Sequence, residues 1–386
     1  MERFVGIDLH KNTFSVCVLN SEGSVESEST HRISPASLDA FRCGLTGSDT
    51  VCFEVSTSAW EMYDLLCDRV GRVVVANPMK TRLLCGGDPK TDKLDARRLA
   101  RLTQDKHIAE VWVPDRETRE MREMVRFRQQ LTNIKTRMGN VRLCRESLEA
   151  FKSADPYEAL VGPKRSEARA LMSECAQDIE KAAGAQLAKL DSVFTQWALS
   201  DTRALRLMRH PGIGPFVAAT YISAMGDITR FPNSKKAASY TGLVPRVHAS
   251  GETSYNGRIT KAGRKELRHA LVQAAWVAIR CDQELASFYR RIAKARGSGK
   301  AIVAVARKMA VRLWHLTVEG SSDGLMSEEK YTAKLTRLIS EHARQYAEGG
   351  TMVAAARKIA KQAYNPEEPG KGTAGSQALP ITISSA

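Results

Sequence analysis

Four acidic side chains in the first hundred residues have the type and spacing that could bind divalent cations. Asp8 ends a predicted strand in the motif GID, and Glu54 ends a later predicted strand in the motif FEV. Asp92 and Asp95 open a predicted helix, where they share one face and where the free backbone amides favour negative charge.

Neighbouring parallel strands could bring such acids together, and a bound cation would offset their repulsion. Oxygen-only ligands suit Mg²⁺, and a pair of these ions is a common apparatus for phosphoryl transfer. Each acid alone has an ordinary structural explanation, because a strand-end Asp is typical of turns and Asp92 could cap its helix. The order and settings of all four together favour a metal site.

The second half of the chain contains a different set of candidates. The turn HPGIGP, residues 210–215, is typical of a helix-hairpin-helix, in which Gly212 and Gly214 would leave amides free for phosphate oxygens. An ordinary pair of helices joined by a turn is the alternative. A polar, glycine-punctuated loop is then predicted over residues 240–264. It carries Ser250 beside a glycine and four candidate phosphate contacts, Arg246, Arg258, Lys261 and Arg264.

The elements that must position these residues are predicted from hydrophobic periodicity. Strands alternate with helices up to about residue 105, which indicates an α/β sheet covered on both faces. We expect strands within 3–20, 24–33, 51–55 and 73–76, and helices over 37–45, 59–70 and from about 92. Ser37 is the expected N-cap of the first helix.

Residues 113–200 have a helical pattern with a narrow apolar seam, which predicts two antiparallel helices forming a long coiled-coil arm. The arm could pack on itself or pair with another protomer. Residues 201–320 are predicted to form a mainly helical domain, followed by a helical extension whose end, 365–386, has the composition of a disordered tail.

The net positive charge is concentrated in the second half of the chain. The formal net charge is +15, and residues 203–315 contain 21 Lys and Arg against 5 Asp and Glu. So local an excess favours a phosphate-binding surface over a merely solvated basic face.

Other classes of protein fit poorly. Eight scattered cysteines without a CxxC pair argue against a disulfide framework or a zinc site. No signal-peptide layout or membrane-spanning run is present, so we expect no membrane partner and a cytoplasmic or nucleoid location in a prokaryote. The 6% aromatic content argues against reading single-stranded bases mainly by stacking.

Two ordered motif sets carry a specific resemblance. The arrangement GID … FEV … TDKLDAR, followed by GLVPR … SG … GRITKAGRKELRHAL, resembles the bridge-RNA-guided insertion-sequence transposases. The resemblance implies an RNase H-like (RuvC-like) DEDD domain over 1–112, the helical arm, and a basic serine-bearing transposase domain over 201–320. It further implies that Asp8, Glu54, Asp92 and Asp95 form the metal-binding quartet.

The same resemblance implies a nucleophile. The family's serine falls on Ser250, with Ser254 in the same loop as the fallback, and its hydroxyl would form a covalent phosphoserine linkage to DNA. Because serine is a poor nucleophile near pH 7, the metal would activate it. One departure concerns the segment after Glu54: VSTS, residues 55–58, lacks the glycine that many members have there. The local loop shape is thereby in question, but the carboxylate is in place.

The resemblance also implies partners: donor and target double-stranded DNA, a structured guide RNA, and a homo-oligomer, dimer or tetramer, whose active sites are shared between protomers. The sequence leaves two alternatives open. The front domain could be a RuvC-like nuclease with a non-catalytic DNA-binding second half. The chain could also be a non-enzymatic DNA- or RNA-binding protein whose acids are structural.

Overall fold

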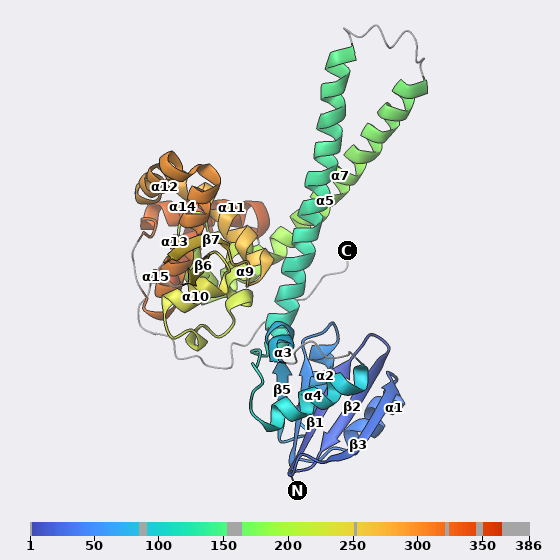
Figure 1. Cartoon of the computed structure of the whole chain (residues 1–386). Helices are drawn as coiled ribbons and strands as arrows, with labels where there is room; N and C mark the ends of the chain where they lie inside the picture. Colours follow the sequence, from blue (N-terminus) through green and yellow to red (C-terminus); the bar gives the residue numbers. More distant parts are fainter. Residues whose placement is uncertain are drawn as a thin grey trace. The chain divides into compact units, whose positions relative to one another are not determined.

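The computed structural model describes residues 2–84, 91–152, 164–250, 253–320, 324–344 and 350–364. The chain divides into two compact units, Met1–Pro114 and Asp115–Ala386, each of which is described by itself (Figure 1).

The first unit contains a five-stranded mixed sheet in the order β3-β2-β1-β4-β5. Strands β1, β2 and β3 are antiparallel neighbours, whereas β4 and β5 run parallel to β1. This mixed α/β sheet is consistent with the RNase H-like domain that the sequence predicts. The strands are β1 (Arg3–Leu9), β2 (Thr13–Leu19), β3 (Val25–Arg32), β4 (Asp49–Glu54) and β5 (Arg72–Ala76).

Helices cover both faces of this sheet, as predicted. Helices α1 (Pro35–Cys43) and α2 (Ala59–Leu66) pack on one face, where Val5, Ile7 and Phe53 are fully buried. On the other face, helix α4 (Asp92–Gln104) contributes Ala96, Ala100 and Leu99 to two small apolar clusters with the strands. A short helix, α3 (Pro78–Leu84), follows β5.

The prediction that Ser37 caps the first helix is wrong. Ser34 is the N-cap, and Ser37 is the third helical residue, with its hydroxyl accepting from the Ser34 amide in a capping box. The helix begins earlier than predicted because Pro35 suits the first helical position, where no amide hydrogen bond is lost. Helix α4 is capped by Thr91, whose side chain accepts from the Leu94 amide, so Asp92 is not used as a cap.

The second unit begins with two 37-residue helices, α5 (Arg116–Lys152) and α7 (Lys164–Ser200), which lie side by side. Between them Arg128 binds Asp191 through two hydrogen bonds of 2.6 and 3.1 Å, and Arg142 binds Glu180 at 3.2 Å. One end of the pair packs on helix α9 (Pro215–Met225) through a small core that includes Met121, Val125, Phe194 and Ala219.

A large helical core completes the second unit. A buried Tyr331 donates to the Leu205 carbonyl at 2.8 Å, which joins two of its helices. The further elements are α8 (Thr202–Met208), α9 (Pro215–Met225), η1 (Ile228–Arg230), α10 (Ser234–Tyr240), β6 (Pro245–Ser250), β7 (Thr253–Ile259), α11 (Lys265–Cys281), α12 (Gln283–Arg296), α13 (Ser298–Val318), α14 (Glu328–His342) and α15 (Met352–Tyr364).

The predicted loop over 240–264 is largely a β-hairpin, which corrects the sequence analysis. Strands β6 and β7 pair antiparallel, and close glycine contacts fix the base of the hairpin. A Cβ on Gly263 would lie 1.8 Å from the Tyr240 carbonyl oxygen, and Gly242 has a φ of +71°. The backbone approach between these two turns is therefore possible only with glycine. The predicted tail, 365–386, lies outside the described residues.

Candidate active site

The acidic site lies at the end of β1, where two carboxylates and an imidazole meet. The Nε2 atom of His10 lies 3.1 Å from an oxygen of Asp8 and 3.3 Å from an oxygen of Asp92. One ligand atom from each of these three residues lies within 4.8 Å of the others. Two of the four predicted acids, 84 positions apart in the sequence, are thus neighbours in space.

Helix α4 can lie this close to β1 because of Gly6. A Cβ at Gly6 would lie 2.0 Å from the Ala96 carbonyl oxygen and 2.5 Å from the Ala100 nitrogen, so only a glycine allows the approach. Asp8 is two residues further along β1 and therefore points to the same face of the sheet. That face is the one covered by α4, whose first turn carries Asp92 and Asp95.

Glu54 occupies the matching position on the next strand. Ile7 pairs with Phe53 in the parallel register of β1 and β4, so Asp8 and Glu54 are the next residues along their strands and share a face. Asp95 lies one turn into α4 and binds Arg98 at 3.0 Å. Among the described residues, the side chains that converge are those of Asp8, His10 and Asp92, whereas Glu54 and Asp95 are outside this cluster.

The electrostatics of the site favour a cation. The pKa of Asp8 is raised above its ordinary value, first by partial burial and then by the negative charges of Asp92 and Asp95, while His10 acts in the opposite direction. A carboxylate that is destabilised by like charges gains most from a cation between them.

The donor set fits a divalent metal ion. Asp8 and Asp92 offer the carboxylate oxygens that Mg²⁺ prefers, and they are already close enough to share one ion. An imidazole nitrogen is a good ligand for transition ions and is an unusual one for Mg²⁺. His10 contacts both carboxylates, and its ring is the third potential ligand of the cluster.

His10 was not identified from the sequence, although a signal was present. Residues 8 and 10 are two apart, and the side chains of a strand alternate between its faces, so a continued β1 would put both on one side. The periodic apolar pattern ends at Leu9, and His10 follows the strand.

In the second unit, the backbone places Ser250 at the end of β6, where it pairs with Thr253, and Ser254 pairs with Ala249. Gly251 and Glu252, which connect the strands, lie outside the described residues. The rings of His248 and Tyr255 stack across the two strands with centroids 4.9 Å apart. The hairpin is thus a two-stranded support that ends at the predicted nucleophile.

The predicted phosphate contacts surround the same hairpin. Arg246 and Arg258 are exposed on its two strands, and Lys261 is exposed just beyond it. Arg264 is partly buried, and burial lowers the pKa of its guanidinium from the ordinary value. These four residues lie along the strands or at the base of the hairpin, whereas Ser250 is at its other end, next to the turn.

The two predicted glycines of the turn before α9 differ in their surroundings. Gly212 has a φ of +81°, and a Cβ there would lie 2.3 Å from the Ala274 carbonyl oxygen of α11, so this position requires glycine for packing. Gly214 is the N-cap of α9, and a Cβ there would meet open space.

Comparison with known proteins places these features in a family. Residues 5–148 match a family model described as a transposase of the DEDD type from IS110 elements, and residues 204–290 match the Transposase IS116/IS110/IS902 family.

Among the described residues, no helix has the length and apolar character needed to cross a bilayer.

Individual relatives agree. The protein y4qE of Sinorhizobium fredii, named as a transposase, is 27% identical over 82% of this chain and 89% of its own length. The transposase for insertion sequence element IS1111A of Coxiella burnetii is 31% identical over 29% of this chain and 32% of its own. The pilin gene-inverting protein of Moraxella bovis is 36% identical over 28% of this chain and 34% of its own.

Together, the mixed sheet with its acidic edge and the two family matches define a transposase with an N-terminal DEDD-type domain. The chain belongs to the IS116/IS110/IS902 family of insertion-sequence transposases. The resemblance predicted from the motifs is confirmed to this extent. A DEDD-type domain also indicates that a divalent metal ion is used.

Proposed function

We propose that this transposase cuts and rejoins DNA through a covalent phosphoserine intermediate, with Mg²⁺ held at the acidic edge of its sheet. The observation that carries the proposal is the convergence of Asp8, His10 and Asp92 at the end of β1. A family relative named for inverting a gene supports rejoining as well as cutting, because an inversion requires both.

Asp8, Glu54, Asp92 and Asp95 would hold the metal, which we propose to be a pair of Mg²⁺ ions. When bound, such ions supply Lewis-acid stabilisation of the phosphate charge and lower the pKa of a coordinated hydroxyl group. Gly6 and the first turn of α4 keep the carboxylates in place, and His10 orients two of them. Glu54 and Asp95 lie outside the observed cluster, so binding by all four carboxylates requires these two side chains to turn toward the ion.

Ser250 would act as the nucleophile, with Ser254 as the second candidate. Its hydroxyl oxygen gives up its proton and forms a bond to the DNA phosphorus, the phosphorus–oxygen bond to one sugar breaks, and the released sugar oxygen takes up a proton in exchange. Attack by a hydroxyl of another strand reverses the step and rejoins DNA without loss of a phosphodiester bond. Arg246, Arg258, Lys261 and Arg264 would hold the phosphates on either side, and the amides at Gly212 and Gly214 would hold a more distant one.

The partners follow from the same family relation. We propose that the chain acts on donor and target double-stranded DNA, that a structured RNA selects the sites, and that protomers of a dimer or tetramer share active sites. The charge excess of residues 203–315 supports the nucleic-acid partners.

Trapping the intermediate tests the chemistry. Wild type, Ser250→Ala, Ser254→Ala and Asp8→Ala are incubated with end-labelled DNA carrying the element ends, with Mg²⁺ or with EDTA, and are run on denaturing gels. We expect a protein–DNA adduct in wild type and Ser254→Ala with Mg²⁺, and none in the other two variants or with EDTA. Asp39→Asn, at an exposed position on α1, is the matched acidic control and should form the adduct.

The second candidate function is a metal-dependent nuclease that uses water as its nucleophile. The acidic cluster alone would support it, because all of its residues lie in the first unit. DNA cutting that survives both serine substitutions and is lost in Asp8→Ala would replace the first proposal with this one. Activity that is indifferent to Asp8→Ala would contradict both.

A further inference from the structure

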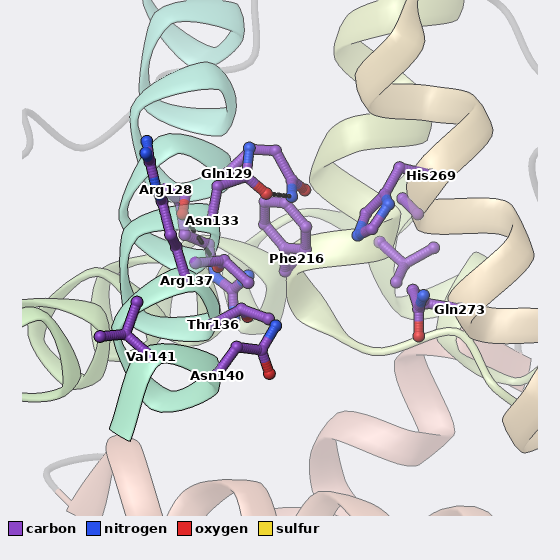
Figure 2. A pocket seen from close by; sticks show the side chains of 13 residues that line it. Arg128, Gln129, Asn133, Thr136, Arg137, Asn140, Val141, Phe216, His269 and Gln273 are labelled. Atoms are coloured by element: carbon purple, nitrogen blue, oxygen red, sulfur yellow. Dashed lines mark hydrogen bonds between the residues drawn. The ribbon is translucent and has the colours of Figure 1, made fainter. Parts of the chain in front are cut away.

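A groove in the second unit is lined by residues that belong neither to the acidic cluster nor to the hairpin, and no part of the proposed chemistry uses it. It has a volume of about 950 Å³ and lies between α5, α9 and α11 (Figure 2). We call it the α5–α11 groove. Its volume is in the range of about 300–1,000 Å³ that is typical of pockets for small organic molecules, so it suits one nucleotide and is too small for a duplex.

Uncharged hydrogen-bonding groups make up most of the groove wall that α5 forms. Gln129, Asn133, Thr136 and Asn140 recur at steps of four, three and four residues and therefore share one face of the helix. Gln129 donates to the Asn133 side-chain oxygen at 3.0 Å, which fixes both amides. On a helix that is otherwise rich in charge, this neutral stripe is a local exception.

The opposite wall has the same character. His269 and Gln273, one turn apart on α11, face the α5 stripe across the groove (Figure 2). Both are exposed and have no hydrogen-bond partner among the described side chains. Side-chain amides recognise base edges through paired donor and acceptor atoms, as in the contact of Asn or Gln with adenine.

The floor offers a flat surface for stacking. Phe216 lies between the two walls, and the guanidinium of Arg128 stacks on its ring at 4.0 Å from the centroid. Asp191 holds Arg128 in place from the other side. Aromatic rings and guanidinium planes are the surfaces on which unpaired bases stack in nucleic-acid complexes.

A cationic side chain that could bind a phosphate group is also present in the groove. Arg137 lines the groove, is exposed, and forms no ion pair within the described ranges. Neutral amides, a stacking surface and one available cation match the three parts of a nucleotide: base edge, base plane and phosphate. A purely anionic ligand would not need the amides, and an apolar ligand would leave them unpaired at a cost.

We propose that the α5–α11 groove binds an unpaired nucleotide that is displaced from a duplex or presented by a single strand. A DNA strand and an RNA strand would present the same kind of ligand to the groove, a base with its sugar phosphate. Binding here goes beyond the cutting chemistry and does not depend on it, because none of the groove residues belongs to the acidic cluster or to the hairpin.

The test uses the full chain carrying Asp8→Ala, so that cutting does not interfere. Probes of one mixed sequence are a single-stranded DNA hexamer, the matching RNA hexamer, a blunt duplex, and the same duplex with one unpaired adenine. Affinity is measured by fluorescence anisotropy for the parent and for Asn133→Leu, Gln273→Leu and Thr136→Trp, the last of which fills the groove. Gln130→Leu is the matched control, because Gln130 is exposed on the same helix but does not line the groove.

We expect each groove variant to weaken binding of the single strands and of the bulged duplex by about tenfold, in line with the loss of one paired base contact. Binding of the blunt duplex should be unchanged, as should all binding by Gln130→Leu. The hexamer, DNA or RNA, whose affinity the groove substitutions reduce more identifies the source of the nucleotide. Equal affinity of all variants for the single strands would overturn the proposal, and so would an equal loss for the blunt duplex. Because the parent already lacks Asp8, neither result bears on the phosphoserine mechanism.

Discussion

Gly6 of β1 lies directly against the backbone of Ala96 in α4, so close that a Cβ at Gly6 would be 2.0 Å from the Ala96 carbonyl oxygen. This contact sets the distance between strand and helix, and through it the distance between Asp8 and Asp92. A backbone carbonyl inside a helix cannot move aside without disturbing the helix.

Substitution of Gly6 by alanine should therefore destabilise the first unit. We expect the free energy of unfolding to fall by about 3 kcal/mol, at the upper end of the usual cost of overpacking. Urea unfolding followed by circular dichroism measures the change. Gly47→Ala is the control, because a Cβ there meets nothing within 4 Å, and it should have little effect. Equal stability of the two variants would contradict the close packing.

Divalent ions should stabilise the first unit through its acidic cluster. A ligand that binds only the folded state raises the free energy of unfolding, by about 2.7 kcal/mol at a hundredfold excess over its dissociation constant. We expect Mg²⁺ or Mn²⁺ to raise the melting temperature of wild type and of Asp39→Asn, and to have no effect on Asp8→Asn or Asp92→Asn. A rise in melting temperature that persists in the Asp8 variant would place the ion elsewhere.

Duplex binding should depend steeply on salt. Each phosphate neutralised by a basic side chain contributes a slope of about −0.9 to the log–log dependence of affinity on salt. We expect Arg246→Gln and Arg258→Gln, at exposed positions on the hairpin, each to reduce the slope by about that amount. Arg32→Gln, exposed at the end of β3 in the first unit, should leave it unchanged. A flat salt response in wild type would argue against the basic half as the contact surface.

Acid should destabilise the second unit through His210. This residue is 1% exposed, its Nδ1 donates to the Pro211 carbonyl at 2.8 Å, and burial lowers its pKa to about 4. The folded state thus keeps the ring neutral, whereas the unfolded chain takes up a proton near its ordinary pKa of 6.5. The contribution of His210 to the free energy of unfolding is therefore complete above pH 6.5 and decreases as the pH drops toward 4. The total loss is roughly 3 kcal/mol, at about 1.4 kcal/mol per pH unit.

Urea unfolding at pH 7 and pH 5 measures this effect. His210→Phe should lose this part of the pH dependence, while His248→Gln, at an exposed position, should keep it. An unchanged pH dependence in His210→Phe would show that the ring is not the group responsible.

The sequence was sufficient to predict the α/β sheet and the position of two of the acids. Strand ends and helix starts are set by local signals, so Asp8 and Asp92 could be placed at the same edge before any contact was known. Their neighbour His10 was missed because the apolar alternation stops at Leu9, and only the observed distances show its role.

The hairpin and the α5–α11 groove could not be predicted, for related reasons. Strands β6 and β7 lack an apolar alternation, and their base is fixed by contacts such as that of Gly263 with Tyr240, which are 23 residues apart. The groove combines Asn133, Phe216 and His269 from three helices. Polar stripes on single helices are common, and only their packing shows which of them face one another.

Each unit has apolar clusters of its own, and the division between the units falls between Pro114 and Asp115. A crossover between two related genes at that point would leave both interiors intact. Mobile elements could therefore acquire new front and back halves from different parents, and family trees drawn from the two halves of such chains need not agree.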